Sequence, residues 1–213
     1  MNSSTHEDMF EEWAKEAMAH GLISDYTRKP EAFEILGAAN ISVKKQLKTK
    51  AVVSQKNILH GIKYYPDFVL LIKGKLHPKL FSNIDETPSL PLGQMFAHYE
   101  ESLWDDDLHV VYVDVKGAKN RFGMSESDVT FPLKQKMVFD KFNRYINKVV
   151  LFPDKEKGPA DGMLFNETFI PASLVPDMYY KDNGTRKGAR RFQKMNYKTI
   201  NEFLKDSFTE TLF

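Results

Sequence analysis

Apolar residues near the N-terminus recur at helical spacing and predict a helix over residues 7–20. Gly21 follows this stretch and suits the position just past a helix end. Residues 22–30 read as a connection. The apolar face of the expected helix comprises Phe10, Trp13, Ala14 and Ala17.

Short apolar runs further along the chain predict the strands of a sheet. The runs at residues 68–72 and 110–113 are continuous, as in strands that are buried on both faces. The first belongs to an extended segment that turns at residues 73–75, where a glycine stands. Further strands, some of them weak, are expected over residues 32–36, 51–59, 148–152, 163–165 and 168–170.

Two further helices are expected, over residues 134–145 and 197–208. The first carries an apolar stripe, and Pro132 stands near its start, where a missing N–H costs little. A glycine-containing loop, residues 117–128, precedes it. The order of helix, strands, helix and strand predicts an α/β fold in which helices cover the faces of a mixed β-sheet.

Prolines help to mark the expected boundaries of a core, an insertion and an extension. Residues 1–153 are expected to form the core, and residues 77–107 to form a mid-chain insertion with a short helix over 95–104. Residues 154–213 are expected to form a C-terminal extension packed on the core.

Composition excludes several classes of protein. The 213 residues include no cysteine, so disulfides, zinc thiolate sites and thiol nucleophiles are ruled out. No apolar run is long enough to cross a bilayer, and the polar N-terminus is unlike a signal peptide, so a cytoplasmic protein without membrane contact is expected. The net charge is +1, but residues 44–56 and 186–198 are basic and free of acids. Each run is either a solvated loop or part of a phosphate-binding face.

Charged residues stand at the ends of the two apolar runs, at positions where a buried strand would carry hydrophobic residues. Asp67 precedes the first run, and Asp114 and Lys116 follow the second. Alternation along a strand places Asp114 and Lys116 on one face and Val115 on the other. Two carboxylates can hold a divalent cation through hard oxygen ligands, and a lysine beside them can orient water or offset charge on a phosphate.

The phrases Tyr-Pro-Asp-Phe at residues 65–68 and Val-Asp-Val-Lys-Gly at 113–117 resemble the PD-(D/E)XK nuclease superfamily, which has the restriction-endonuclease-like fold. Among its members, the chain is similar to phage-encoded endonucleases of the Holliday-junction-resolvase-like kind. The resemblance spans about residues 8–152 and implies an Mg²⁺-dependent DNA endonuclease, with Mn²⁺ as a substitute and branched or junction DNA as the favoured substrate. Because one such site cuts one strand at a time, cutting of both strands or symmetric junction cutting would imply a homodimer.

The resemblance assigns roles to individual residues. Asp67, Asp114 and the Val115 carbonyl are expected to bind the metal, together with an acid of the first helix. Glu11 is the first choice for that acid, Glu12 the second, and Glu7 and Glu16 are alternatives. Lys116 and Lys134 are expected to act on the attacked phosphate. Beyond the resemblance, the basic composition of residues 186–194 favours contacts with DNA phosphates. The residues expected to contact DNA are Lys119, Arg186, Lys187, Arg190 and Arg191.

Two other functions share these features. One is a protein of the same fold that binds nucleic acid without cutting it. The other is the strand-cleaving subunit of a transposition or recombination complex, which would use the same catalytic core.

Overall fold

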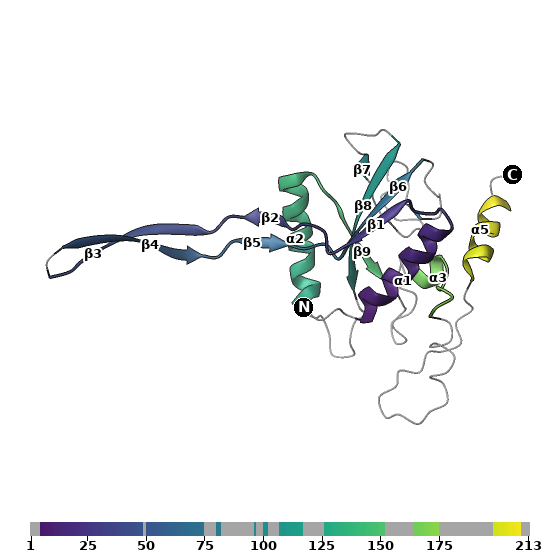
Figure 1. The fold of residues 1–213 in the computed structure, drawn as a ribbon, viewed down its shortest axis with the longest axis horizontal. Coiled ribbons are helices and arrows are strands. Elements are labelled where there is room, and N and C mark those ends of the chain that lie inside the picture. Colours follow the sequence, from purple (N-terminus) through teal and green to yellow (C-terminus); the bar gives the residue numbers. More distant parts are fainter. Residues whose placement is uncertain are drawn as a thin grey trace, which may run out of the picture.

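A five-stranded sheet forms the centre of the protein (Figure 1). The computed structural model describes residues 5–48, 50–74, 80–81, 96, 100–101, 107–116, 126–151, 164–174 and 198–209. Strand β8 is the middle of the sheet, antiparallel to β6, which is in turn antiparallel to β1. On the other side of β8, β7 pairs with its first half and β9 runs parallel to its second half. The strands of this sheet are β1 (Asp25–Arg28), β6 (Phe68–Lys73), β7 (Glu100–Glu101), β8 (Leu108–Lys116) and β9 (Ile146–Val150).

Helix α1 (Thr5–Ala19) covers one face of the sheet. Its predicted apolar face is confirmed, since all four of its residues are completely buried against the sheet. Gly21 follows with φ of 74°, a conformation that favours glycine at a helix end. The sheet residues in this main core include Phe68, Leu70, Ile72, Val111, Val113, Val115 and Val149.

Helix α2 (Glu126–Phe142) packs on a second, smaller core. Phe131 and Val138 of α2 contact Ile146 of β9 in this cluster, with Ile35 and Tyr64 from the segment that precedes β6. The sheet is therefore covered by different helices on its two faces, as the α/β prediction requires.

A long two-stranded hairpin leaves the body of the protein between β1 and β6 (Figure 1). Its base is the pair β2 (Phe33–Leu36) and β5 (Ile62–Tyr64), which we call the arm base. Beyond the base, β3 (Ala39–Gln46) and β4 (Ala51–Leu59) form an antiparallel ribbon, which we call the arm. Figure 1 shows the arm projecting far from the sheet and helices.

Two C-terminal helices, α3 (Leu164–Glu167) and α5 (Ile200–Thr209), contribute to the main core. The indole Nε1 of Trp13 donates a 3.1 Å hydrogen bond to the Thr168 hydroxyl, which itself donates to the Leu164 carbonyl at 2.6 Å. Trp13 also stacks on Phe169 with ring centroids 5.6 Å apart. These contacts attach residues 164–174 to α1. None of the helices described is long and apolar enough to span a bilayer.

Several boundaries differ from the sequence expectation. Residues 22–30 are not a plain connection, because β1 pairs along the edge of the sheet with β6. Its alternately exposed and half-buried side chains lack the apolar run that marks a buried strand. Strand β3 was not predicted either, because none of its residues is fully buried.

The helix and strand assignments also need correction at three places. Helix α2 begins at Glu126 rather than near residue 134, so Pro132 lies inside it and removes one helical hydrogen bond. Residues 100–101 are strand β7 rather than part of a helix. Residues 164–167 are helical rather than extended, because the amide and hydroxyl of Thr168 bond back to Leu164.

Candidate active site

Asp67 and Asp114 meet where β6 begins and β8 ends. Phe68 and Val113 are the last paired residues of these two strands. Asp67 comes directly before Phe68, and Asp114 comes directly after Val113. The Asp67 backbone N–H donates to the Val113 carbonyl at 3.0 Å. The Val115 N–H donates to Asp67 Oδ2 at 2.7 Å. The long segment between the two motifs therefore does not separate their strands.

Lys116 lies beside Asp114 on the same strand face, as alternation predicts. Its Nζ is 2.5 Å from Asp114 Oδ2, and it lies 5.5 Å from the ring centroid of Phe131 on α2. Val115 points the other way, into the main core. The alternation of these three residues is therefore confirmed, and helix α2 borders the lysine.

Tyr64 is a site neighbour that the motifs did not indicate. Its side chain is buried in the smaller core, three residues before Asp67. Burial raises the pKa of its hydroxyl, and the nearby Asp114 carboxylate raises it further. The hydroxyl makes no well-formed hydrogen bond with any residue that the structure describes. Tyr64 therefore presents a neutral O–H next to the two acids.

The electrostatic environment of Asp67 differs from that of a surface carboxylate. Removal from water raises the pKa of Asp67 to about 7, and the Asp114 carboxylate acts in the same direction. The hydrogen bond from Val115 and the charge of Lys116 oppose that rise. Two carboxylates that share a desolvated place repel each other, so a bound cation would be favoured there.

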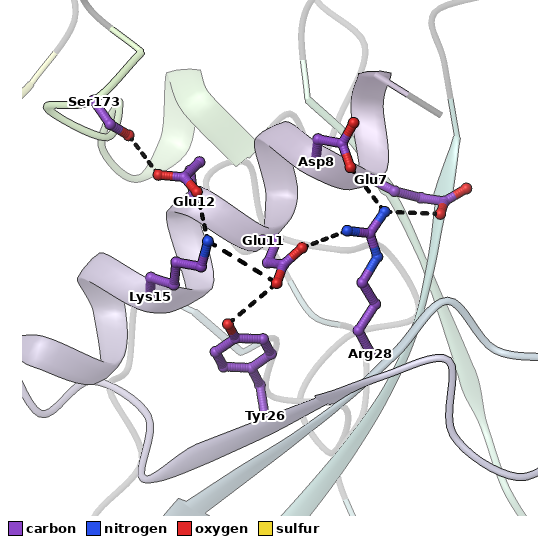
Figure 2. A network of polar contacts seen from close by, with 8 residues as sticks. All are labelled: Glu7, Asp8, Glu11, Glu12, Lys15, Tyr26, Arg28 and Ser173. Carbon is purple, nitrogen blue, oxygen red and sulfur yellow. Dashed lines mark hydrogen bonds and ion pairs between the residues drawn. The ribbon is translucent and has the colours of Figure 1, made fainter. Parts of the chain in front are cut away.

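The acids of helix α1 divide into two groups (Figure 2). Glu12 accepts a 2.8 Å hydrogen bond from the Ser173 hydroxyl. Glu16 accepts one of 2.8 Å from the Ala172 N–H. These two glutamates fasten α1 to the segment after α3. Their partners belong to the segment after α3 and not to β6 or β8, so these two glutamates are poorly placed to complete the site.

Glu11 points toward β1 instead. It pairs with Arg28 and lies 3.5 Å from the Tyr26 hydroxyl, both on β1 (Figure 2). Lys15 Nζ lies 4.0 Å from Glu11 Oε1, the oxygen that the Tyr26 hydroxyl also contacts. The first choice for the helix acid is thus held within a network of hydrogen bonds and charges on the outer strand.

Glu7 is the α1 acid whose charge acts on Asp67. It is among the groups that raise the pKa of Asp67, and it contacts Arg28 Nη2 at 3.4 Å. Asp8 completes the set of acids around Arg28, at 2.8 Å from the same nitrogen (Figure 2). Glu7 and Glu11 thus contact the same arginine, and both remain candidates for the helix acid.

The remaining predicted residues fall in two groups. Lys134 is half-buried on α2, three residues after Phe131. Its neighbour Gln135 donates from Nε2 to the Ile146 carbonyl at 2.5 Å and so helps to hold α2 on β9. The expected DNA contacts Lys119, Arg186, Lys187, Arg190 and Arg191 lie outside the described residues.

The donor set at this site suits a hard cation. Within the residues that the structure describes, no cluster of three or more His, Cys, Asp or Glu side chains is arranged to hold a metal. Asp67 and Asp114 alone offer two carboxylates, with the Val115 carbonyl as a backbone candidate. Mg²⁺ is commonly bound through one or two carboxylates, with waters and substrate phosphate as its other ligands. The residues present are therefore compatible with Mg²⁺.

Arg28 is a second residue that motif reading missed. It belongs to a strand that was expected to be a connection, and it joins the acids of α1 to the outer edge of the sheet. In the sequence, the acids at the start of the first helix indicate only that a basic partner such as Arg28 could pair with them.

No protein-family model, curated protein or solved structure matches this chain.

Proposed function

We propose that this chain is a metal-dependent nuclease that hydrolyses phosphodiester bonds in DNA, with Asp67, Asp114 and Lys116 as its catalytic group. One observation carries the proposal. Two desolvated carboxylates and a lysine lie together at the ends of two paired strands, 47 residues apart in the chain (114 − 67).

The order of elements supports the same proposal. Helix α1 precedes three antiparallel strands, β1, β6 and β8, and helix α2 then leads to β9, which is parallel to β8. Apart from β1, which was expected to be part of a connection, this is the order of helix, two motif-bearing strands, helix and strand that the resemblance to the restriction-endonuclease-like fold implies. The candidate acids occupy the two strands on which that superfamily places them.

The chain's own residues would divide the work as follows. Asp67 and Asp114 would hold the cation, and the Val115 N–H keeps the Asp67 carboxylate in a fixed orientation. When bound, the cation supplies charge that polarises the phosphate and favours ionisation of an attacking water. Lys116 would orient that water and offset the charge that develops on the phosphate oxygens. Phe131 restricts where the ammonium group can lie.

An acid of α1, Glu7 or Glu11, would act with this group, and the charge of Glu7 makes a minor contribution to the raised pKa of Asp67. Tyr64 would donate a hydrogen bond to Asp114 or to a bound water, because its hydroxyl remains protonated at neutral pH. Neither residue replaces the three that carry the chemistry.

Cleavage assays with Mg²⁺ or Mn²⁺ test the proposal on a panel of linear duplex, single-stranded, flap and four-way-junction DNA. Asp114→Asn and Lys116→Met should each slow cleavage by at least about 100-fold. Asp25→Asn and Lys73→Met are matched controls, because both residues are exposed on the same sheet and lie away from the site. The controls should cut at the wild-type rate.

Two results would reject this function. Wild-type rates for both site variants would show that the chemistry lies elsewhere. Failure of the wild-type protein to cut any member of the panel, with either metal, would favour the non-cutting nucleic-acid-binding alternative. The preferred substrate of the panel would tell junction cutting from general duplex cutting.

A further inference from the structure

The arm, formed by β3 and β4, lacks the packing that supports the other strands. Every residue of β4 is exposed, and β3 contains only two half-buried residues, Ala39 and Val43. An isolated two-stranded ribbon is marginally stable in water. A partner that binds along the arm would therefore supply contacts that the rest of the chain does not.

The charge of the arm is of one sign. No Asp or Glu occurs between Glu34 and Asp67, whereas the arm and its turn carry five lysines. The whole chain has a net charge of only +1, so the basic charge is concentrated on this projection. The lysines are Lys44, Lys45, Lys48, Lys50 and Lys56, and all are exposed.

The strand register distributes these lysines over both faces of the ribbon. Lys45 pairs across from Val52, and Lys56 from Ile41, on one face. Lys44 pairs across from Val53 on the other face. A ribbon with cations on both faces fits a ligand that has negative charge on both sides of it.

The second face also carries neutral hydrogen-bonding groups. Asn40 faces Asn57, and Ser42 faces Gln55, whose Nε2 donates a 2.9 Å hydrogen bond to the Ser42 hydroxyl. Amide and hydroxyl side chains can bond to base edges and to phosphates. Charge and hydrogen-bonding groups thus occur on the arm together with exposed apolar side chains such as Val53 and Leu59.

The base of the arm is fixed next to the candidate active site. Tyr64 at the end of β5 is buried beside Asp114, and only two residues separate it from Asp67. Lys141 of α2 donates from Nζ to the Glu34 and Ile35 carbonyls, at 2.7 and 3.0 Å. A ligand held along the arm would therefore extend toward the acids.

We propose that the arm is a DNA-binding element that lies in the major groove of duplex DNA and guides it to Asp67 and Asp114. At roughly 3.3 Å per residue, the eight residues of β3 make the arm about 25 Å long. The major groove of B-form DNA admits a two-stranded ribbon and has phosphates along both rims. The major groove of A-form RNA is too narrow for side chains to read, which favours DNA.

Only one part of this inference rests on the proposed function, namely that DNA held by the arm is guided toward Asp67 and Asp114. Binding by the arm can be measured without a metal, so it can be tested apart from cleavage. Removing divalent cations also prevents the substrate from being consumed during the measurement.

Equilibrium binding of a fluorescent 30-base-pair DNA duplex, without divalent metal and over a range of salt, is the direct test. Lys45→Gln/Lys56→Gln removes two charges from one face of the arm. Lys73→Gln/Lys136→Gln removes two exposed charges from the body of the protein and is the matched control. Loss of two phosphate contacts should make the slope of log affinity against log salt shallower by roughly 2 in the arm variant.

A fourfold arm variant, with Lys44 and Lys50 also changed to Gln, should make the slope shallower by roughly 3 to 4. The control should keep the wild-type slope. Because all four lysines are exposed, the variants should fold normally, which circular dichroism checks.

Three outcomes would overturn the proposal. Arm variants that bind with the wild-type slope would show that the lysines do not contact phosphates. Equal losses on double-stranded RNA would contradict the major-groove assignment. A wild-type dimer that dissociates when the arm's exposed Val53 is changed to Lys, with DNA affinity unchanged, would assign the arm to self-association. Cleavage lost by Asp114→Asn with normal arm-dependent binding would support both proposals, whereas arm-dependent binding without any cleavage would reject only the nuclease function.

Discussion

The Val115 backbone N–H donates a hydrogen bond of 2.7 Å to the Asp67 side chain, and so ties the start of β6 to the end of β8. Asp67 is held beside Asp114 although its burial and the neighbouring charge raise its pKa to about 7. The ionised pair is therefore unfavourable in the metal-free protein, and several predictions depend on that relationship.

Asp67→Asn should stabilise the metal-free protein at pH 8, by about 1 to 3 kcal/mol. The amide oxygen can still accept the bond from Val115, and the repulsion with Asp114 is removed. Urea unfolding of the two proteins in chelator measures the difference. Asp25→Asn, on the exposed edge of the sheet, should leave stability nearly unchanged. An equal or lower stability for Asp67→Asn would show that Asp67 is not strained by its surroundings.

The same pKa predicts how stability depends on pH. The folded-state pKa of Asp67 lies above the unfolded value of 3.8, so the folded state binds more protons between pH 4 and 7. The Asp67 contribution should thus lower stability as pH rises through that window and stay constant above it. The difference in unfolding free energy between wild type and Asp67→Asn, measured from pH 4 to 8, should grow with pH. A difference independent of pH would contradict the raised pKa.

Metal affinity should also depend on pH, because the cation competes with the proton on Asp67. Below pH 7 the apparent affinity for Mn²⁺ should fall by up to tenfold per pH unit, and above pH 7 it should level off. Calorimetric titration of the intact protein at pH 5.5, 6.5 and 7.5 gives the slope. Asp114→Asn should bind the metal much more weakly at all three values. Tight, pH-independent binding by that variant would place the metal elsewhere.

Glu7→Gln and Glu11→Gln should differ in their effects. Glu7 adds negative charge near Asp67, so its replacement should weaken Mn²⁺ binding and cleavage. Its 3.4 Å contact with Arg28 is longer than the Glu11 contact, so the loss of stability should be smaller than for Glu11→Gln. Glu11 is paired with Arg28 and Tyr26, so its replacement should lower stability by about 1 kcal/mol and affect metal binding less. Thermal unfolding and metal titration of both variants separate the two roles. The reverse pattern would favour Glu11 over Glu7 as the acid of α1 that acts with the metal.

Gly61 should be sensitive to substitution because the chain passes closely there between the arm and its base. A Cβ at this position would lie 2.9 Å from the Leu36 carbonyl oxygen, and backbone must shift to admit it. Gly61→Ala should therefore destabilise the protein by about 1 to 3 kcal/mol. Gly37→Ala is the control, since its Cβ would meet only the Glu34 side chain, at 4.0 Å. Equal stability of the two variants would contradict the close approach.

Thr168→Val should test how residues 164–174 are attached to α1. The change leaves the buried Trp13 indole N–H without its acceptor and should cost about 1 to 3 kcal/mol. Thr27→Val, at an exposed position of β1, should cost little. Thermal unfolding of both variants provides the comparison, and a neutral Thr168→Val would show that this bond does not hold the segment.

Local patterns were sufficient for the parts of the fold that have a run or stripe of apolar residues facing the main core. The face of α1 and the runs in β6 and β8 could be predicted from the sequence, because burying apolar side chains away from water is favourable and their positions therefore indicate the buried face. The alternation around Asp114, Val115 and Lys116 follows from strand geometry alone. The sequence by itself therefore determined the candidate catalytic group and the two strands that carry it.

Only the tertiary structure decided the features that depend on pairing between distant segments. Strands β1 and β3 contain no fully buried residue, so their sequences carry no pattern that separates them from loops, whereas β4 matches the strand expected over residues 51–59. The contact of both Glu7 and Glu11 with Arg28 of β1 also depends on how α1 packs beside that strand. The meeting of Asp67 with Asp114 required the register of β6 with β8, because a motif states which residues carry charge but not which charges come together.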